Sequence, residues 1–217
     1  MLNPQPPASP GGFPDRPAAS PSTPPPGLRL GACGISDTIN AVIPVDLLEE
    51  YGLHWVKTER DARYPRARRL TAEEQGSMTP FFSPAALAVA RIQHIPTIPN
   101  PAFYDALPQM GLAIPLDFSR MWGLTLIDCI LIAESKVGVG QLPRQLLFHE
   151  LVHVVQYQLL GVDDFIHRYV RGWAANGEDY NRIPIEVQAY TLDQQYAAEP
   201  SRPFPVKEVV AATLHTL

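Results

Sequence analysis

The segment between Pro143 and Gly161 constrains the fold most strongly. It contains no proline or glycine, and its apolar residues lie around most of the circumference of a helix. Pro143 suits the first turn of a helix, and Gly161 suits the left-handed position just beyond a helix end. A helix that is apolar on most sides belongs in the interior of a protein. The sequence therefore predicts a central, buried helix around which the rest of the chain folds.

Two histidines and a glutamate lie within this apolar helix: His149, Glu150 and His153. The two histidines are four residues apart, so both imidazoles project from one face and can reach one cation at ~2.0–2.1 Å. Glu150 is rotated by about 100° from His149, where it can accept a proton from a water bound to the metal. Burying all three groups is costly unless a metal compensates them. The alternative is a helix whose histidines meet carbonyls or acids and whose glutamate faces water.

A catalytic zinc usually takes a third protein ligand. The metzincin pattern is excluded, because Gln156 and Leu159 replace its glycine and its third histidine. A later carboxylate remains, and the candidates are Glu178, Asp179, Glu186 and Asp193. Glu186 is favoured, because it lies early in an apolar helical segment where an acid faces inward or destabilises the fold. Asp193 is expected to orient a ligand histidine.

The residues around these ligands resemble a known family. HELVHVVQ, preceded by LTLIDCILI and followed by IPIEVQAY, is similar to the minimal gluzincin-type metallopeptidase domains of bacterial proteins. The resemblance covers 123–195 and implies a small zincin-like domain with a short sheet packed on the active-site helix. It also implies that the strand Leu126–Ile132 borders the cleft and pairs with an extended peptide. One departure is Ile185, since the longest-known members have an asparagine before the glutamate ligand.

The expected function is zinc-dependent hydrolysis of peptide bonds through a metal-activated water. Zn²⁺ would be held by His149, His153 and Glu186, with Glu150 as the general base. An additional hydrogen-bond donor is expected to stabilise the developing oxyanion. Tyr190 is the first candidate, because it lies one turn after Glu186 on the same helix face; the other candidates are His167 and Tyr180.

Two alternatives remain open at this stage. Peptide deformylases also use this histidine spacing with an upstream cysteine ligand, and Cys129 lies upstream of His149, although inside an apolar segment. The second alternative is a non-catalytic protein, in which a gluzincin-like fold serves as a zinc-binding or interaction module. Substitution of Glu150 separates catalysis from metal binding.

The order of the predicted elements indicates an α+β fold with a mostly helical C-terminal half. Residues 1–27 are rich in proline and predict a disordered tail, and 28–217 predict a single domain with its metal-site core at about 123–195. Helices are expected at 43–51, 163–173, 184–196 and 207–217, strands in the later half of 85–98 and at 124–132, and loops at 57–69 and 174–181.

The composition limits the kinds of binding partner that are expected. The net charge of −5 argues against general nucleic-acid binding, and the most apolar stretch, 124–133, is too short for a membrane span. The two cysteines, Cys33 and Cys129, do not form a disulfide framework. We interpret the match of residues 30–33 to a lipoprotein cleavage site as chance, because no apolar segment precedes it. A cytoplasmic protein with a peptide or protein substrate is expected, and the oligomeric state stays open.

Overall fold

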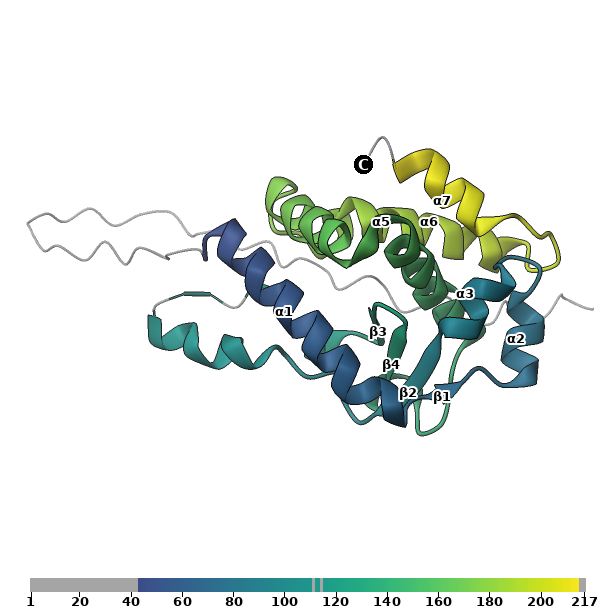
Figure 1. Ribbon diagram of the computed structural model, residues 1–217, viewed down its shortest axis with the longest axis horizontal. Helices are drawn as coiled ribbons and strands as arrows, with labels where there is room; N and C mark the ends of the chain where they lie inside the picture. Colours follow the sequence, from purple (N-terminus) through teal and green to yellow (C-terminus); the bar gives the residue numbers. More distant parts are fainter. Residues whose placement is uncertain (1–42, 111, 114, 215–217) are drawn as a thin grey trace, which may run out of the picture. The chain divides into compact units, whose positions relative to one another are not determined.

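The fold was taken from a computed structural model that describes residues 43–110, 112–113 and 115–214. The predicted Pro-rich tail and Cys33 lie outside these residues. The architecture is α+β, as predicted, with a small sheet and a mostly helical C-terminal half (Figure 1). The helices are α1 Val45–Arg63, α2 Ala72–Met78, α3 Pro84–Val89, α4 Glu134–Val137, α5 Arg144–Ala175, α6 Pro184–Ala198 and α7 Val206–Leu214. The strands are β1 Arg68–Arg69, β2 Arg91–Ile95, β3 Gly123–Leu126 and β4 Cys129–Ala133. Short 3-10 helices are η1 Tyr64–Arg66, η2 Ala102–Ala106, η3 Pro108–Met110, η4 Phe118–Arg120 and η5 Tyr180–Arg182.

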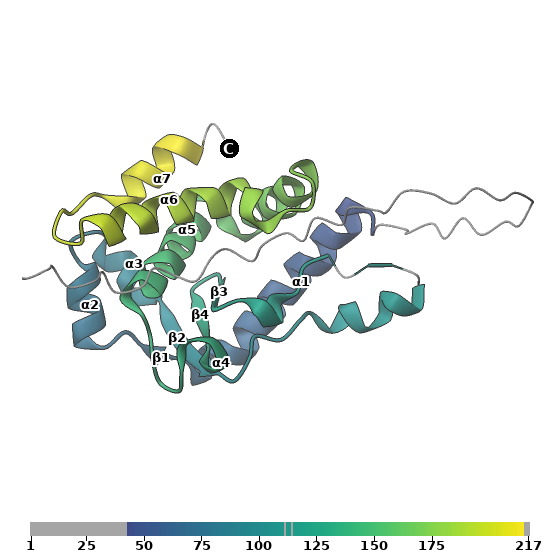
Figure 2. The ribbon, with the colours of Figure 1, turned by 180° about the vertical axis from the view of Figure 1, so that it is seen from behind.

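The sheet has the strand order β1-β2-β4-β3 (Figure 2). β2 and β4 are parallel, with Ile92 opposite Ile130, and the other two pairs are antiparallel. All five residues of β4 are buried, as the apolar, β-branched sequence predicted for a strand in the core. β2 ends at Ile95 because Pro96 cannot donate a ladder hydrogen bond.

The sequence predicted a single strand over 124–132, and this prediction is wrong. The segment forms the hairpin β3–β4, with a tight turn at Ile127 and Asp128. Such turns need positive φ, for which asparagine and glycine are the usual signals, yet here Ile127 adopts φ 63°. Arg60 holds the turn by donating from Nε and Nη2 to both carboxylate oxygens of Asp128, each at 2.7 Å. The edge role predicted for Leu126–Ile132 therefore holds only for Leu126, which lies in the edge strand β3, and is wrong for residues 129–132, because β4 is an interior strand.

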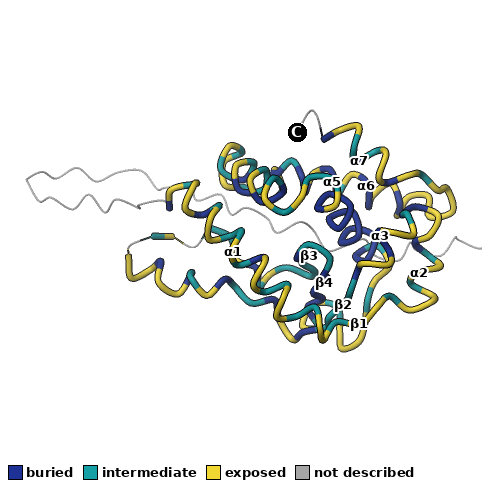
Figure 3. The backbone as a smooth tube through the Cα atoms, in the orientation of Figure 1, coloured by how far each residue is buried: buried dark blue, intermediate teal, exposed yellow. Residues whose placement is uncertain are grey.

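The central helix α5 confirms the prediction from its sequence. Its backbone departs from helical geometry at Gly161, with φ 75° and ψ 170°, so that two helical segments meet at a kink. Glycine tolerates this conformation because it lacks a β-carbon. In the first segment every residue over 146–157 is buried (Figure 3). The sheet, α1, α3, α6 and α7 all pack against α5.

Helix α1 extends well beyond its predicted end, so that much of the basic stretch 57–69 is helical and the predicted loop is wrong. Four of the basic side chains in this stretch are paired with acids: Lys57, Arg60, Arg63 and Arg68. Arg63 bonds Glu59 one turn earlier at 2.7 Å, and Lys57 bonds Asp163 of α5 at 2.8 Å. Ion pairs between residues four apart, and between a helix and its neighbour, favour the helical conformation. The basic composition of the stretch did not show that these acidic partners would be within reach.

Helices α6 and α7 lie where the sequence predicted them, within two residues at most ends. An aromatic cluster fixes α6 on α5: the rings of Phe148 and Tyr196 stack with centroids 4.5 Å apart, and Phe81 meets both edge-on. This packing sets the position of the helix that carries Glu186. Within the described ranges, none of the helices has the length and apolar character needed to cross a bilayer.

Candidate metal centre

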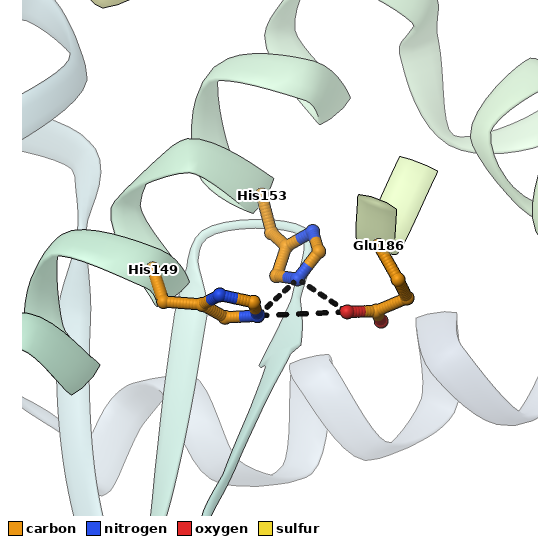
Figure 4. Close-up of side chains that lie close together, drawn as sticks. All are labelled: His149, His153 and Glu186. Atoms are coloured by element: carbon orange, nitrogen blue, oxygen red, sulfur yellow. Dashed lines mark hydrogen bonds and ion pairs between the residues drawn. The ribbon is translucent and has the colours of Figure 1, made fainter. Parts of the chain in front are cut away.

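Three predicted ligands converge between α5 and α6 (Figure 4). The Nε2 atoms of His149 and His153 are 3.1 Å apart. The Oε2 atom of Glu186 lies 3.5 Å from the first and 3.4 Å from the second. All three residues are buried, at 5%, 5% and 4% exposure. The sequence placed the two histidines on one helical face, and the tertiary fold brings the distant glutamate to them.

These distances fit a tetrahedral zinc. Bonds of ~2.0–2.1 Å to a tetrahedral ion place neighbouring ligand atoms about 3.3–3.4 Å apart, close to the three spacings found here. Moreover, Glu186 Oε2 is buried without a hydrogen-bond partner among the described residues. A buried carboxylate oxygen left unpaired is costly, and a cation shared with the imidazoles removes that cost. The residues present therefore fit a divalent metal ion.

The other nitrogen of each imidazole is held by a buried acceptor. His149 Nδ1 lies 2.7 Å from Asp193 Oδ2, as predicted for that residue, and His153 Nδ1 lies 2.7 Å from Gln156 Oε1. Each Nδ1 therefore carries a proton, which leaves Nε2 as the nitrogen of each ring that can bind a metal at the shared point. Such outer partners orient metal-binding histidines.

Gln156 is a functional residue that the sequence analysis used only to exclude a motif. Its Nε2 donates to Ile185 O at 3.0 Å and to Gln188 Oε1 at 2.7 Å. These two acceptors fix the orientation of the amide, so Oε1 must face His153. Gln188 in turn donates to the Val210 carbonyl of α7 at 3.4 Å. A glutamine three residues after His153 in an otherwise apolar helix was the available signal.

Glu150 lies beside the ligands under the edge strand. It is 3% exposed, and Thr125 of β3 donates to its Oε2 at 2.7 Å. Gly123 of the same strand permits this approach, because a β-carbon there would lie 2.3 Å from Glu150 Oε1. Burial raises the pKa of Glu150, which makes its carboxylate a better proton acceptor than an exposed glutamate.

The charged groups around His149 and Glu186 outweigh the effect of burial on the pKa values of these two side chains. Burial lowers the pKa of His149, but the nearby carboxylates of Asp193 and Glu186 outweigh it and raise that pKa to about 10. Burial likewise raises the pKa of Glu186, but the neighbouring charges of His153 and His149 overcome it and hold the pKa well below the ordinary value. The site thus keeps an ionised carboxylate in the interior.

Several tyrosines lie along one side of the site. The Tyr190 ring packs against His149 with centroids 4.6 Å apart, but Tyr190 does not line the adjoining cavity, whereas Tyr169 and Tyr180 do. Burial, together with the charge of Glu186 and a hydrogen bond to it, raises the pKa of Tyr169. Tyr169 was missed because its contact with Glu186 is long-range. His167 lies apart, half exposed and 2.9 Å from Glu49.

The remaining candidates do not join the metal-ligand group. Among the described residues, that group consists of His149, His153 and Glu186. Cys129 is instead fully buried in β4, and burial raises the pKa of its thiol to about 11, which disfavours the thiolate that a metal requires. Glu178 is exposed in the loop before η5, and Asp179 caps η5.

The chain was compared with protein-family models, curated proteins and solved structures, and none of the three comparisons found a match.

Proposed function

We propose that this protein is a zinc-dependent peptidase of the gluzincin type. One observation carries the proposal: three buried ligand atoms from α5 and α6 lie 3.1–3.5 Å apart around one point, with the carboxylate of Glu150 beside them. Histidine, histidine and carboxylate leave one position of a tetrahedral zinc open, as catalytic rather than structural sites do. The resemblance of HELVHVVQ to gluzincin domains supports the same class.

The chain contributes position and proton transfer. When bound, zinc supplies Lewis acidity to water and to a substrate carbonyl. Glu150 accepts the proton of the attacking water and returns it to the leaving nitrogen. Thr125 holds Glu150 in place, while Asp193 and Gln156 hold the imidazoles. Because these groups are buried and already hydrogen-bonded, little reorganisation is needed during the reaction.

The edge strand β3 supplies a place for the substrate backbone. It is the last strand of the sheet on that side, and all four of its residues line the cavity that contains the ligands. An extended peptide can add to a sheet edge through backbone hydrogen bonds. In our proposal the peptide lies along β3, which brings its scissile carbonyl next to Glu150.

The Glu150→Gln substitution tests the proposal. It preserves shape but removes the base, and we expect peptide hydrolysis to fall by roughly 10²–10⁴-fold while zinc content, measured by elemental analysis, stays at one per chain. Glu50→Gln, an exposed glutamate of α1, is the matched control and should retain full activity. Equal hydrolysis by the wild type and Glu150→Gln would remove the general-base assignment.

Metal content and peptide cleavage, measured together, distinguish a zinc peptidase from a protein that only binds zinc. Glu186→Ala should lose stoichiometric zinc, because two imidazoles alone hold it weakly, whereas Glu178→Ala should keep it. If the wild type binds zinc through these ligands but cleaves no peptide in a mixed library, the non-catalytic zinc-binding module takes the place of the peptidase.

A further inference from the structure

A cavity adjoins the candidate metal centre, and its walls are almost entirely apolar. It is lined by α1, η2, η4, β3 and the second segment of α5, as well as by the ligands themselves. Its volume is about 90 Å³, several times the ~10–15 Å³ that a single water requires. Apolar side chains on three of its sides include Leu48, Trp55, Phe103, Phe118, Ile166 and Trp173.

The charge of the lining is restricted to the metal centre. Of the described residues that form the cavity, none is a lysine or an arginine, and the acids are Glu150 and Glu186. A charged group that entered the cavity would lose its hydration without gaining an ion pair, which is strongly unfavourable. An uncharged apolar group would instead leave water for a complementary surface.

Trp173 contributes its indole ring to the wall. The indole Nε1 of Trp173 is buried and has no hydrogen-bond partner within the described part of the chain, and Trp173 itself is 5% exposed. A peptide with a large apolar side chain next to the scissile bond matches these apolar walls.

Building on the proposed function, we infer that the substrates are peptides with a large uncharged apolar side chain, aromatic or aliphatic, beside the scissile bond. The cavity binds that side chain. The metal centre then receives the adjacent carbonyl. Because no basic residue of the described lining is available to pair with a terminal carboxylate, the cleaved bond does not adjoin a free carboxyl terminus.

Gly52 of α1 is the lining position at which a larger residue tests the size of the cavity. It lines the cavity, and a β-carbon there would meet Ile166 Cγ2 at 3.8 Å, an ordinary contact distance. The glycine thus leaves open the space between α1 and the second segment of α5. Because position 52 lines the cavity, a leucine there is expected to take up part of its space on the side of Ile166.

The test measures binding in the absence of turnover. Zinc-loaded Glu150→Gln protein is titrated calorimetrically with end-blocked pentapeptides that differ only at the central residue: Phe, Leu, Ala, Lys or Asp. We expect the Phe and Leu peptides to bind roughly 10- to 100-fold more tightly than the Ala peptide, and the Lys and Asp peptides more weakly still. Adding Gly52→Leu should abolish the advantage of Phe, whereas Gly76→Leu, at an exposed site of α2, should preserve it.

Several outcomes overturn the inference. Equal affinity for all five peptides, no binding of any of them, or an unchanged Phe preference in folded Gly52→Leu protein would each do so. Gly52→Ala is the milder second variant if leucine prevents folding, and it should reduce the Phe advantage in part. The Phe preference can persist even if the wild type hydrolyses no peptide; recognition would then stand while the peptidase proposal fails.

Discussion

Replacing Gln156 with methionine tests how the structure orients a metal ligand. The side chain is fully buried, at 0% exposure, and methionine is close to it in size and shape. The variant therefore removes hydrogen bonds while leaving little empty space. His153 Nδ1–H would lose its acceptor at 2.7 Å, and Gln188 Oε1 would lose its donor at 2.7 Å. Ile185 O would lose a third bond of 3.0 Å.

The expected magnitudes follow from these lost bonds. A buried polar group left unpaired costs about 1–3 kcal/mol. Leaving His153 Nδ1–H and Gln188 Oε1 unpaired therefore lowers the free energy of unfolding by roughly 2–6 kcal/mol, to which the bond lost at Ile185 O adds, a large share of the ~5–15 kcal/mol of a typical protein. For zinc, losing a partner that orients a ligand weakens affinity by about 10- to 100-fold, which corresponds to roughly 1.4–2.8 kcal/mol.

Zinc affinity is measured by competition with a chromophoric chelator, and folding is checked by circular dichroism and denaturant unfolding. Gln156→Glu offers a comparison, because it keeps an acceptor for His153 but turns an acid toward Gln188; we expect it to retain zinc affinity while losing stability. Gln195→Met, at an exposed site of α6, controls for the substitution itself. Folded Gln156→Met protein that binds zinc within twofold of the wild type would refute the orienting role.

Three further predictions address the general base, pH and the hairpin. Gly123→Ala should lower kcat on the order of 10²-fold with zinc content unchanged, since its β-carbon would lie 2.3 Å from Glu150 Oε1; unaltered kcat would contradict this. The pKa of His149 is raised to about 10, so zinc must displace a proton from this ring below that pH. The affinity for zinc should therefore rise about tenfold per pH unit between about pH 6 and 9. Chelator titrations measure this, and a flat profile would contradict it. The same proton stabilises the metal-free protein at low pH, and that contribution is lost as pH rises toward 10. Arg60→Met should cost about 1–3 kcal/mol in denaturant unfolding, because it leaves the half-buried carboxylate of Asp128 unpaired; no change in the midpoint would show that the bond does not hold the turn.

The sequence by itself determined what depends on neighbours along the chain. The apolar circumference of the segment after Pro143 predicts a buried helix, and its period of 3.6 residues places His149 and His153 on one face. Pro184 and the apolar residues after it likewise predict α6 and the inward direction of Glu186. These features follow from local backbone geometry, which is the same in any protein.

The tertiary structure decided what depends on contacts between distant segments. The bond from Arg60 to Asp128 stabilises a hairpin whose turn lacks the usual residues, and this hairpin divides the predicted strand into the edge strand β3 and the interior strand β4. The orientation of Gln156 is fixed by acceptors on α6, and the apolar cavity exists because η2 and η4 lie beside α1. Such contacts depend on side-chain packing summed over the whole domain, which the periodicity of a single segment does not encode.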